Sequence, residues 1–304
     1  MRKPIKIPWK GVYPAITTQF NPQSKLNLVA FSNNLKAQIS AGIHGVVLGG
    51  SLGEASTLQQ VEKTRLLKKA LSICNNKIPV LVNIAESSTL NAIRAAELAQ
   101  YGGADGLMLL PPMRYKATEH ETVEFLKDVA QSTPLPIMLY NNPVDYKINI
   151  SLDMLESLIE VPNIQAIKES SRDVTNVQRI NARFGDRIHI LCGVDTIALE
   201  SMVLGAQGWV AGLCNAFPTE TVALYELAKK NEIQKAQQLL SWFLPLLELD
   251  LSPQLVQNIK HCELTTQMGT GFVRKPRLPL SDDQKFEIDK ILKKAMKKRP
   301  NISI

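Results

Sequence analysis

The chain has 304 residues, 45% of them hydrophobic and 21% charged, with a formal net charge of +7. This is the composition of an ordinary globular protein that is long enough to bury a core. The basic residues show neither zinc-finger spacing nor an aromatic-basic stripe, and no apolar run reaches the length of a membrane span, so we expect no nucleic-acid binding and no membrane insertion.

Short apolar runs alternate with helical patterns along the first 230 residues, separated by Gly, Pro and other turn residues. The predicted strands span 11–20, 44–50, 79–85, 106–112, 136–143, 164–171, 188–193 and 208–213. The predicted helices span 27–40, 57–74, 88–101, 118–131, 151–160, 174–184, 196–204 and 219–230. Beyond this point only helices are predicted, at 232–249, 254–268 and 282–298.

The strand–helix alternation predicts parallel pairing with helical crossovers. Eight such units favour an α/β fold of the closed (β/α)8 TIM-barrel class, with additional C-terminal helices. A doubly wound open sheet is the alternative, weakened because no GxGxxG fingerprint follows the first strand. We expect residues 1–230 to form the barrel and residues 231–304 a helical extension packed on it.

The spacing of the cysteines and histidines argues against disulfides and against a His-based metal site. The four cysteines lie far apart with no CxxC pair, so reduced thiols are expected. No HxH or HExxH spacing occurs, so we expect no His-based metal site, although carboxylates could still assemble one through the fold. The start, MRKPIKIPWKG, lacks the apolar core of a signal peptide, and a cytoplasmic protein is expected.

The stretch IQAIKESS, residues 164–171, places Lys168 on an apolar strand. Alternation puts Lys168 on one face with Ile164 and Ala166. A buried ammonium is costly unless it is paired or loses its proton, and a neutral amine is a nucleophile toward carbonyls. Lys168 is therefore either a nucleophile or a lysine that is salt-bridged at a strand end, beside Glu169.

Active sites of barrels lie at the carboxyl ends of the strands, which selects further candidates. The turn 49–54, GGSLGE, could bind a carboxylate or phosphate through its backbone N–H groups. Tyr140 is expected to face inward one strand from Lys168, where it would serve as a proton carrier or only as a packing residue. Gly193 and Gly212 would keep a cavity open above Lys168.

The motifs GVYPAITTQF, GGSLGE, LPP, LYNNP, AIKES and CGVD occur in this order over about residues 9–300. Together they resemble the superfamily of dihydrodipicolinate synthase and N-acetylneuraminate lyase. The resemblance implies a Schiff base between Lys168 and a small 2-oxo acid or cyclic imine, with proton relay by Tyr140 and no metal or other cofactor. It also implies a homo-oligomer, usually a tetramer. The implied catalytic and substrate-binding residues are Lys168, Tyr140, Ser51, Gly50, Leu52, Asn142, Asp145, Gly193, Val210 and Met113.

Three positions depart from the synthase pattern of that superfamily. Leu52 replaces a hydroxyl residue, Met113 stands where a tyrosine reaches the neighbouring subunit, and Asp145 stands where an arginine binds the carboxylate of the aldehyde. Arg114 and Tyr115 are neighbours of unassigned role. Because a cationic clamp is lost at position 145, we expect a substrate other than the aldehyde of the synthases.

The longer segments WKGVYPAITTQF, YNNPVDYKINI and WFLPLLELDLSPQLVQNIKHCE look most similar to 1-pyrroline-4-hydroxy-2-carboxylate deaminases. This resemblance implies loss of ammonia and water to give 2,5-dioxopentanoate in hydroxyproline degradation. The alternatives are condensation of pyruvate with an aldehyde, as in dihydrodipicolinate synthase, and dehydration or aldol cleavage of 2-keto-3-deoxy sugar acids. A catalytically silent ligand-binding barrel is the non-enzymatic alternative.

Overall fold

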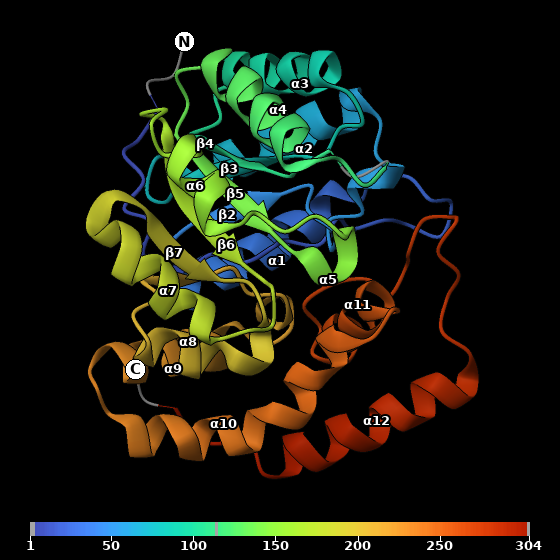
Figure 1. Ribbon diagram of the computed structural model, residues 1–304. Helices are drawn as coiled ribbons and strands as arrows, with labels where there is room; N and C mark the ends of the chain where they lie inside the picture. The colour runs from blue at the N-terminus through green and yellow to red at the C-terminus, as the bar shows by residue number, and fades with distance from the viewer. Residues whose placement is uncertain (1–3, 113–114, 303–304) are drawn as a thin grey trace.

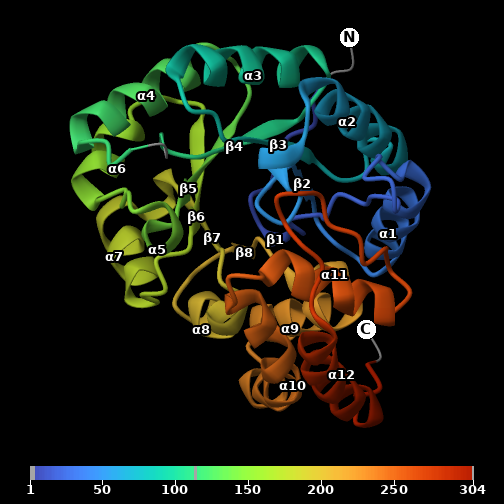
Figure 2. The same cartoon turned by 90° about the vertical axis from the view of Figure 1, so that its right-hand side faces the viewer.

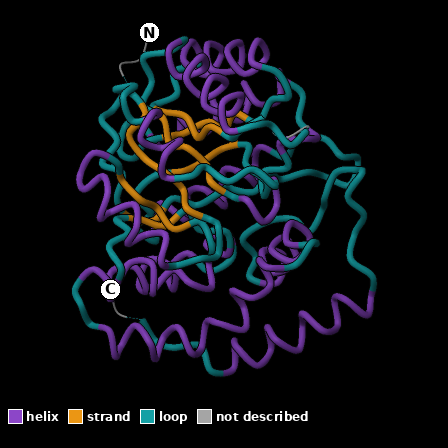
Figure 3. Tube along the Cα trace, in the orientation of Figure 1, coloured by secondary structure: helices purple, strands orange, loops and turns teal. Residues whose placement is uncertain are grey.

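The computed structural model describes residues 4–112 and 115–302. Eight parallel strands form one sheet in the order β1-β8-β7-β6-β5-β4-β3-β2. A bridge between Ala15 and Val47 joins the two edges, so the sheet closes on itself. Helices surround this ring (Figure 2), and the strands occupy its centre (Figure 3). The predicted (β/α)8 barrel is confirmed.

The strands are β1 (Gly11–Val12), β2 (Val46–Leu48), β3 (Val80–Ile84), β4 (Gly106–Leu109), β5 (Ile137–Asn141), β6 (Ile164–Glu169), β7 (His189–Cys192) and β8 (Gly208–Trp209). The helices that follow them are α1 (Leu28–Ser40), α2 (Gln60–Cys74), α3 (Thr89–Tyr101), α4 (Glu119–Gln131), α5 (Pro143–Tyr146), α6 (Leu152–Leu158), α7 (Thr175–Phe184), α8 (Ala198–Val203) and α9 (Pro218–Lys229).

Two predicted strands are much shorter in the structure. The segment 11–20 is a regular strand only at Gly11–Val12, although the N–H groups of Tyr13 and Ala15 still bond the chain at the end of β8. At Thr17 the N–H bonds the Asn215 side chain instead. The segment 208–213 is a regular strand only to Trp209, although the N–H groups of Val210 and Ala211 still bond backbone carbonyls. At Gly212 the N–H donates to the Asp195 carboxylate instead. Side chains therefore replace backbone partners at both carboxyl ends.

A one-turn helix, α5, interrupts a segment that the sequence predicts to be a loop. The Asn142 side chain accepts a hydrogen bond from the Asp145 N–H, and Pro143 occupies the first helical position. Both are ordinary signals for a helix start. The turn brings Asp145 and Tyr146 to the mouth of the barrel.

Three helices follow the eighth unit, namely α10 (Ile233–Leu247), α11 (Leu255–Thr265) and α12 (Asp282–Lys297). Helix α10 packs on α9, and α12 packs on α10, at the bottom of Figure 1. A 3-10 turn, η5 (Glu248–Leu251), joins α10 to the segment before α11. Apolar residues of these helices, including Leu246, Val256 and Leu292, belong to the same core as the barrel. The division at residue 230 stays a prediction.

All four cysteines are buried thiols. None of the helices in the described part of the chain has the length and apolarity that a membrane crossing requires.

Candidate active site

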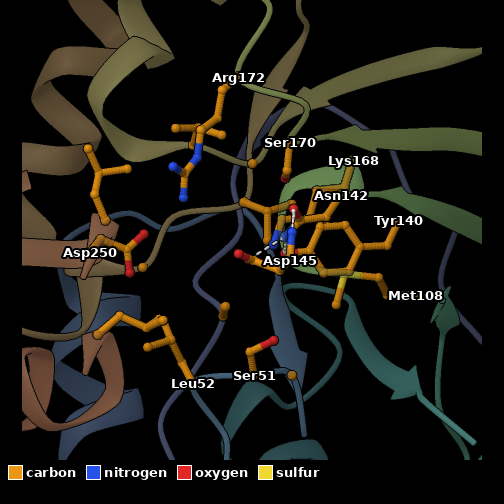
Figure 4. A pocket seen from close by; sticks show the side chains of 18 residues that line it. Ser51, Leu52, Met108, Tyr140, Asn142, Asp145, Lys168, Ser170, Arg172 and Asp250 are labelled. Carbon is orange, nitrogen blue, oxygen red and sulfur yellow. Dashed lines mark hydrogen bonds between the residues drawn. The ribbon is translucent and has the colours of Figure 1, made fainter. Parts of the chain in front are cut away.

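A cavity of about 80 Å³ opens at the carboxyl ends of the strands (Figure 4). The predicted residues around it are Gly50, Ser51, Leu52, Tyr140, Asn142, Asp145, Lys168, Gly193 and Val210. Met113, also predicted, lies outside the described residues. The structure brings the predicted set together, while the role of each residue stays a prediction.

Lys168 lies on β6 directly beside Tyr140 on β5, as the strand register shows. The residue is only 6% exposed, and its Nζ lies 3.9 Å from the centroid of the Tyr140 ring. No hydrogen bond or ion pair joins its Nζ to any residue that the structure describes. Burial lowers the pKa of Lys168, against the opposing influence of Tyr146, Asp250 and Asp195. A neutral amine is thereby favoured.

Glu169 does not pair with Lys168, although it follows it in sequence. The Glu169 carboxylate accepts hydrogen bonds from Asn141, Asn176 and the N–H of Ser171. Alternation along β6 turns the two side chains to opposite faces. The salt-bridge alternative from the sequence is therefore not what the structure contains.

Gly193 leaves the space that the Lys168 side chain occupies. A Cβ at Gly193 would lie 2.5 Å from Lys168 Cε and 2.0 Å from Ser170 Oγ. Both distances are well inside van der Waals contact, so only glycine fits. This requirement gives a steric reason for the predicted place of Gly193 in the site.

Tyr140 lies between Lys168 and α5. Its hydroxyl accepts a hydrogen bond of 3.1 Å from Asn142 Nδ2, which also donates to Asp145 at 2.8 Å. Burial raises the pKa of Tyr140 to about 12, and the hydrogen bond from Asn142 opposes this. The phenol is therefore protonated near neutral pH and is available as a proton donor.

The turn after β2 forms the opposite wall. Gly49 has a φ of +66°, the left-handed conformation that glycine adopts without strain. The N–H groups of Ser51 and Leu52 donate to no residue in the described part of the chain. The Ser51 hydroxyl lies 2.7 Å from the Tyr146 hydroxyl. Two free amides beside a hydroxyl suit a carboxylate ligand.

Two residues that line the cavity, Arg172 and Asp250, and one that packs on the lining, Tyr146, were missed by sequence reasoning. Tyr146, on α5, packs edge-on against Tyr140 with ring centroids 5.6 Å apart. Arg172 follows β6, and Asp250 comes from η5, 40 residues beyond Val210 in number and far outside the strand motifs. The Asn-Pro helix start could have signalled Tyr146, but no sequence pattern marks Arg172 or Asp250.

Asp195, in the CGVD motif, holds two strand ends together through hydrogen bonds. Its carboxylate accepts hydrogen bonds from Trp209 Nε1 and the N–H groups of Gly212 and Leu213. These bonds tie the end of β7 to the turn after β8. No group of three or more His, Cys, Asp or Glu side chains in the described ranges is arranged to hold a metal ion.

Comparisons with known proteins agree with this geometry. The model of the dihydrodipicolinate synthetase family matches residues 8–295. The 4-hydroxy-tetrahydrodipicolinate synthase of Exiguobacterium sibiricum is 34% identical over 272 residues, covering 90% of this chain and 92% of the relative. The synthase of Rickettsia typhi is 31% identical over 291 residues, covering 93% and 96%.

Solved structures extend the comparison. The 4-hydroxy-tetrahydrodipicolinate synthase of Methylacidiphilum fumariolicum superposes with a TM-score of 0.91 at 27% identity, covering 95% of this chain and 96% of that one. A dihydrodipicolinate synthase of Bacillus anthracis gives 0.90 at 27% identity, covering 97% and 100%. Sequence and structure together show that this chain belongs to the dihydrodipicolinate synthetase family.

Proposed function

We propose that the protein is a Schiff-base-forming lyase that acts on a small 2-oxo acid through Lys168. The observation that carries this proposal is a buried lysine, unpaired among the described residues, at the carboxyl end of a barrel strand inside a cavity. Its neutral Nζ attacks the carbonyl carbon, a C–N bond forms, and the carbonyl oxygen leaves as water. The resulting protonated imine withdraws electrons and acidifies the adjacent carbon.

The neighbouring residues divide the remaining work. Tyr140 carries protons to and from the imine and the reacting carbon, because its hydroxyl lies at the same wall as Lys168. The free amides of Ser51 and Leu52 hold the substrate carboxylate, and the Ser51 hydroxyl adds a further hydrogen bond.

Condensation of pyruvate with an aldehyde is the reaction that we favour, because the related proteins are named 4-hydroxy-tetrahydrodipicolinate synthases. Arg172 strengthens this choice. It lines the cavity from the segment after β6 and could bind an anionic aldehyde although position 145 is an aspartate. Asp145 alone therefore does not exclude an anionic aldehyde as the substrate.

The 1-pyrroline-4-hydroxy-2-carboxylate deaminase is the second candidate. Asp145 at the cavity mouth favours a substrate with a hydroxyl or amine, and Leu52 lacks a side-chain donor. In this reaction Lys168 would open the cyclic imine, and the 4-hydroxyl would leave as water from the lysine-bound intermediate before ammonia is released.

Borohydride trapping tests the broad proposal. Pyruvate and borohydride should give a stable adduct on Lys168 by mass spectrometry, and the Lys168→Ala protein should give none. Absence of an adduct from the wild-type protein with pyruvate and with the pyrroline would refute the lyase. Product assays then separate the candidates: turnover of pyruvate with aspartate semialdehyde supports condensation, and ammonia release from 4-hydroxy-pyrroline carboxylate supports the deaminase.

The expected homo-oligomer, a tetramer by resemblance, stays a proposal. One solved relative is described as a monomeric dihydrodipicolinate synthase variant, so more than one state occurs among such proteins. Light scattering of the purified protein would measure the state of this chain.

A further inference from the structure

Asp250 lies in the wall of the cavity, although it comes from the C-terminal helices and not from a barrel strand. In Figure 4 its carboxyl points into the cavity from the side opposite Tyr140. Neither the steps proposed for Lys168 nor those for Tyr140 use it.

The carboxyl of Asp250 has an unmet hydrogen-bonding requirement. Its Oδ1 is out of contact with solvent and has no hydrogen-bond partner among the residues that the structure describes. A buried acceptor without a partner is costly, and native proteins retain few of them. This oxygen packs against Gly212, but Asp250 itself lines the cavity, so a rotation of the carboxyl would let a ligand there supply the missing partner.

The backbone leaves room for this carboxyl. A Cβ at Gly212 would lie 2.8 Å from Asp250 Oδ1 and 3.1 Å from its Cγ. A side chain at position 212 would therefore displace the carboxyl. Glycine at position 212 thus leaves the space that the Asp250 carboxyl occupies.

The charges around Asp250 decide what it can bind. Burial, reinforced by Asp195 and Asp145, raises the pKa of Asp250 to about 8, against the opposing influence of Lys168 and Arg172. The group is then mostly a neutral carboxyl near pH 7, which both donates and accepts hydrogen bonds. A hydroxyl also both donates and accepts hydrogen bonds, so it suits this neutral carboxyl. A carboxylate ligand would be repelled by the nearby Asp195 and Asp145.

We propose that Asp250 is a specificity-determining residue that binds a hydroxyl on the distal part of the substrate, beyond the carbon joined to Lys168. This inference rests on the proposed function. Both candidate reactions involve a molecule with a hydroxyl on its fourth carbon, as the product in one case and the substrate in the other. Asp250 would recognise that group in either case.

The test compares racemic 4-hydroxy-2-oxopentanoate with 2-oxopentanoate, which lacks only the hydroxyl. For each acid, the concentration that half-saturates borohydride trapping on Lys168 is measured by mass spectrometry. Pyruvyl adducts produced by cleavage of the hydroxy acid are counted with the intact ones. We expect the wild-type protein to need about tenfold less of the hydroxy acid, the ratio that one hydrogen bond supplies.

Asp250→Ala and Asp250→Leu should each bring this ratio to about one, because neither side chain binds a hydroxyl. Leucine also fills the space, so it answers the objection that alanine opens a hole. The ratio cancels any general change in the reactivity of Lys168. Glu248→Gln, which neutralises an exposed carboxylate on the same turn, should keep the wild-type ratio.

A wild-type ratio near one, or a tenfold ratio that persists in both Asp250 variants, would overturn the inference while leaving the lyase intact. A wild-type protein that forms no adduct with pyruvate or with either acid would overturn the lyase and this inference together.

Discussion

Two lysines are buried among the residues that the structure describes, and they have opposite surroundings. Lys260, on α11, donates to Glu54 Oε1 at 2.6 Å and to the Phe272 carbonyl at 2.7 Å, with its side chain fully buried. Lys168, on β6, has no such partner among the described residues and faces a cavity. Burial lowers the pKa of both lysines. For Lys260 the strongest opposing influence is a directly paired carboxylate, that of Glu54, whereas for Lys168 it is the Tyr146 hydroxyl.

The contrast teaches that burial alone does not identify a reactive lysine. A paired ammonium remains charged and holds structure, whereas an unpaired amine beside a cavity is available for covalent chemistry. Lys260 still serves the site indirectly. Its partner Glu54 has a φ of +53° and ends the turn that carries Ser51, so the ion pair anchors this wall of the cavity.

The largest expected effect is on catalysis at Lys168. Lys168→Met should lower turnover by roughly a thousandfold or more, because the nucleophile is lost. The melting temperature should not fall, since an unpaired buried amine is replaced by an apolar side chain of similar length. Turnover and thermal unfolding measure the two effects. A variant that keeps a tenth of the activity would contradict the assignment of Lys168.

Lys260 should show the reverse pattern. Lys260→Met leaves the Glu54 carboxylate buried without its ammonium and should lower the free energy of unfolding by about 3–5 kcal/mol. Lys290→Met, which breaks an exposed pair with Glu287, is the control and should cost about 0.5 kcal/mol or less. Denaturant unfolding measures both. Equal losses would mean that the Lys260 pair contributes no more than a surface pair.

A change at Tyr140 separates imine formation on Lys168 from the later proton transfers. Tyr140→Phe keeps the ring beside Lys168 Nζ but removes the hydroxyl that Asn142 contacts. We expect turnover to fall by about a hundredfold, while pyruvate is still trapped on Lys168. Tyr101→Phe, at an exposed position on α3, should change neither measurement. Loss of trapping in Tyr140→Phe would show that Tyr140 is needed before the imine forms.

The smallest effect is a shift along the pH axis. Because burial disfavours the ammonium, the neutral fraction of Lys168 at a given pH exceeds that of an ordinary lysine. The initial rate of pyruvate trapping should therefore rise with pH and level off below 10.5, the ordinary lysine pKa. If the rate levels off only above pH 10.5, the pKa of Lys168 is not lowered and the free protein holds it as an ammonium.

Much of the fold could be predicted from sequence because its signals are local. Apolar runs with period two, helical periodicity and Gly or Pro at the breaks identified the eight units. Strand ends were less predictable. The segments 11–20 and 208–213 leave the sheet where the Asn215 and Asp195 side chains replace backbone partners, and no local pattern reveals such long-range contacts.

The site was predictable where it depends on strand geometry. Alternation and the position of strand ends placed Lys168, Tyr140 and the Ser51 turn around one cavity. Tyr146 was missed because the sequence pattern predicts a loop where the short helix α5 lies. Arg172 and Asp250 were missed because their positions depend on how a loop and the C-terminal helices pack against the barrel.

The sequence by itself determined the strand–helix rhythm, the barrel, and the place of Lys168 at a strand end. Only the tertiary structure decided which lysine is paired and which carboxyl faces the cavity. Glu54 and Lys260 are 206 residues apart, and Asp250 reaches the site from beyond the last strand. Periodicity is set by neighbours in the chain, whereas the pairing of buried charges is set by neighbours in space.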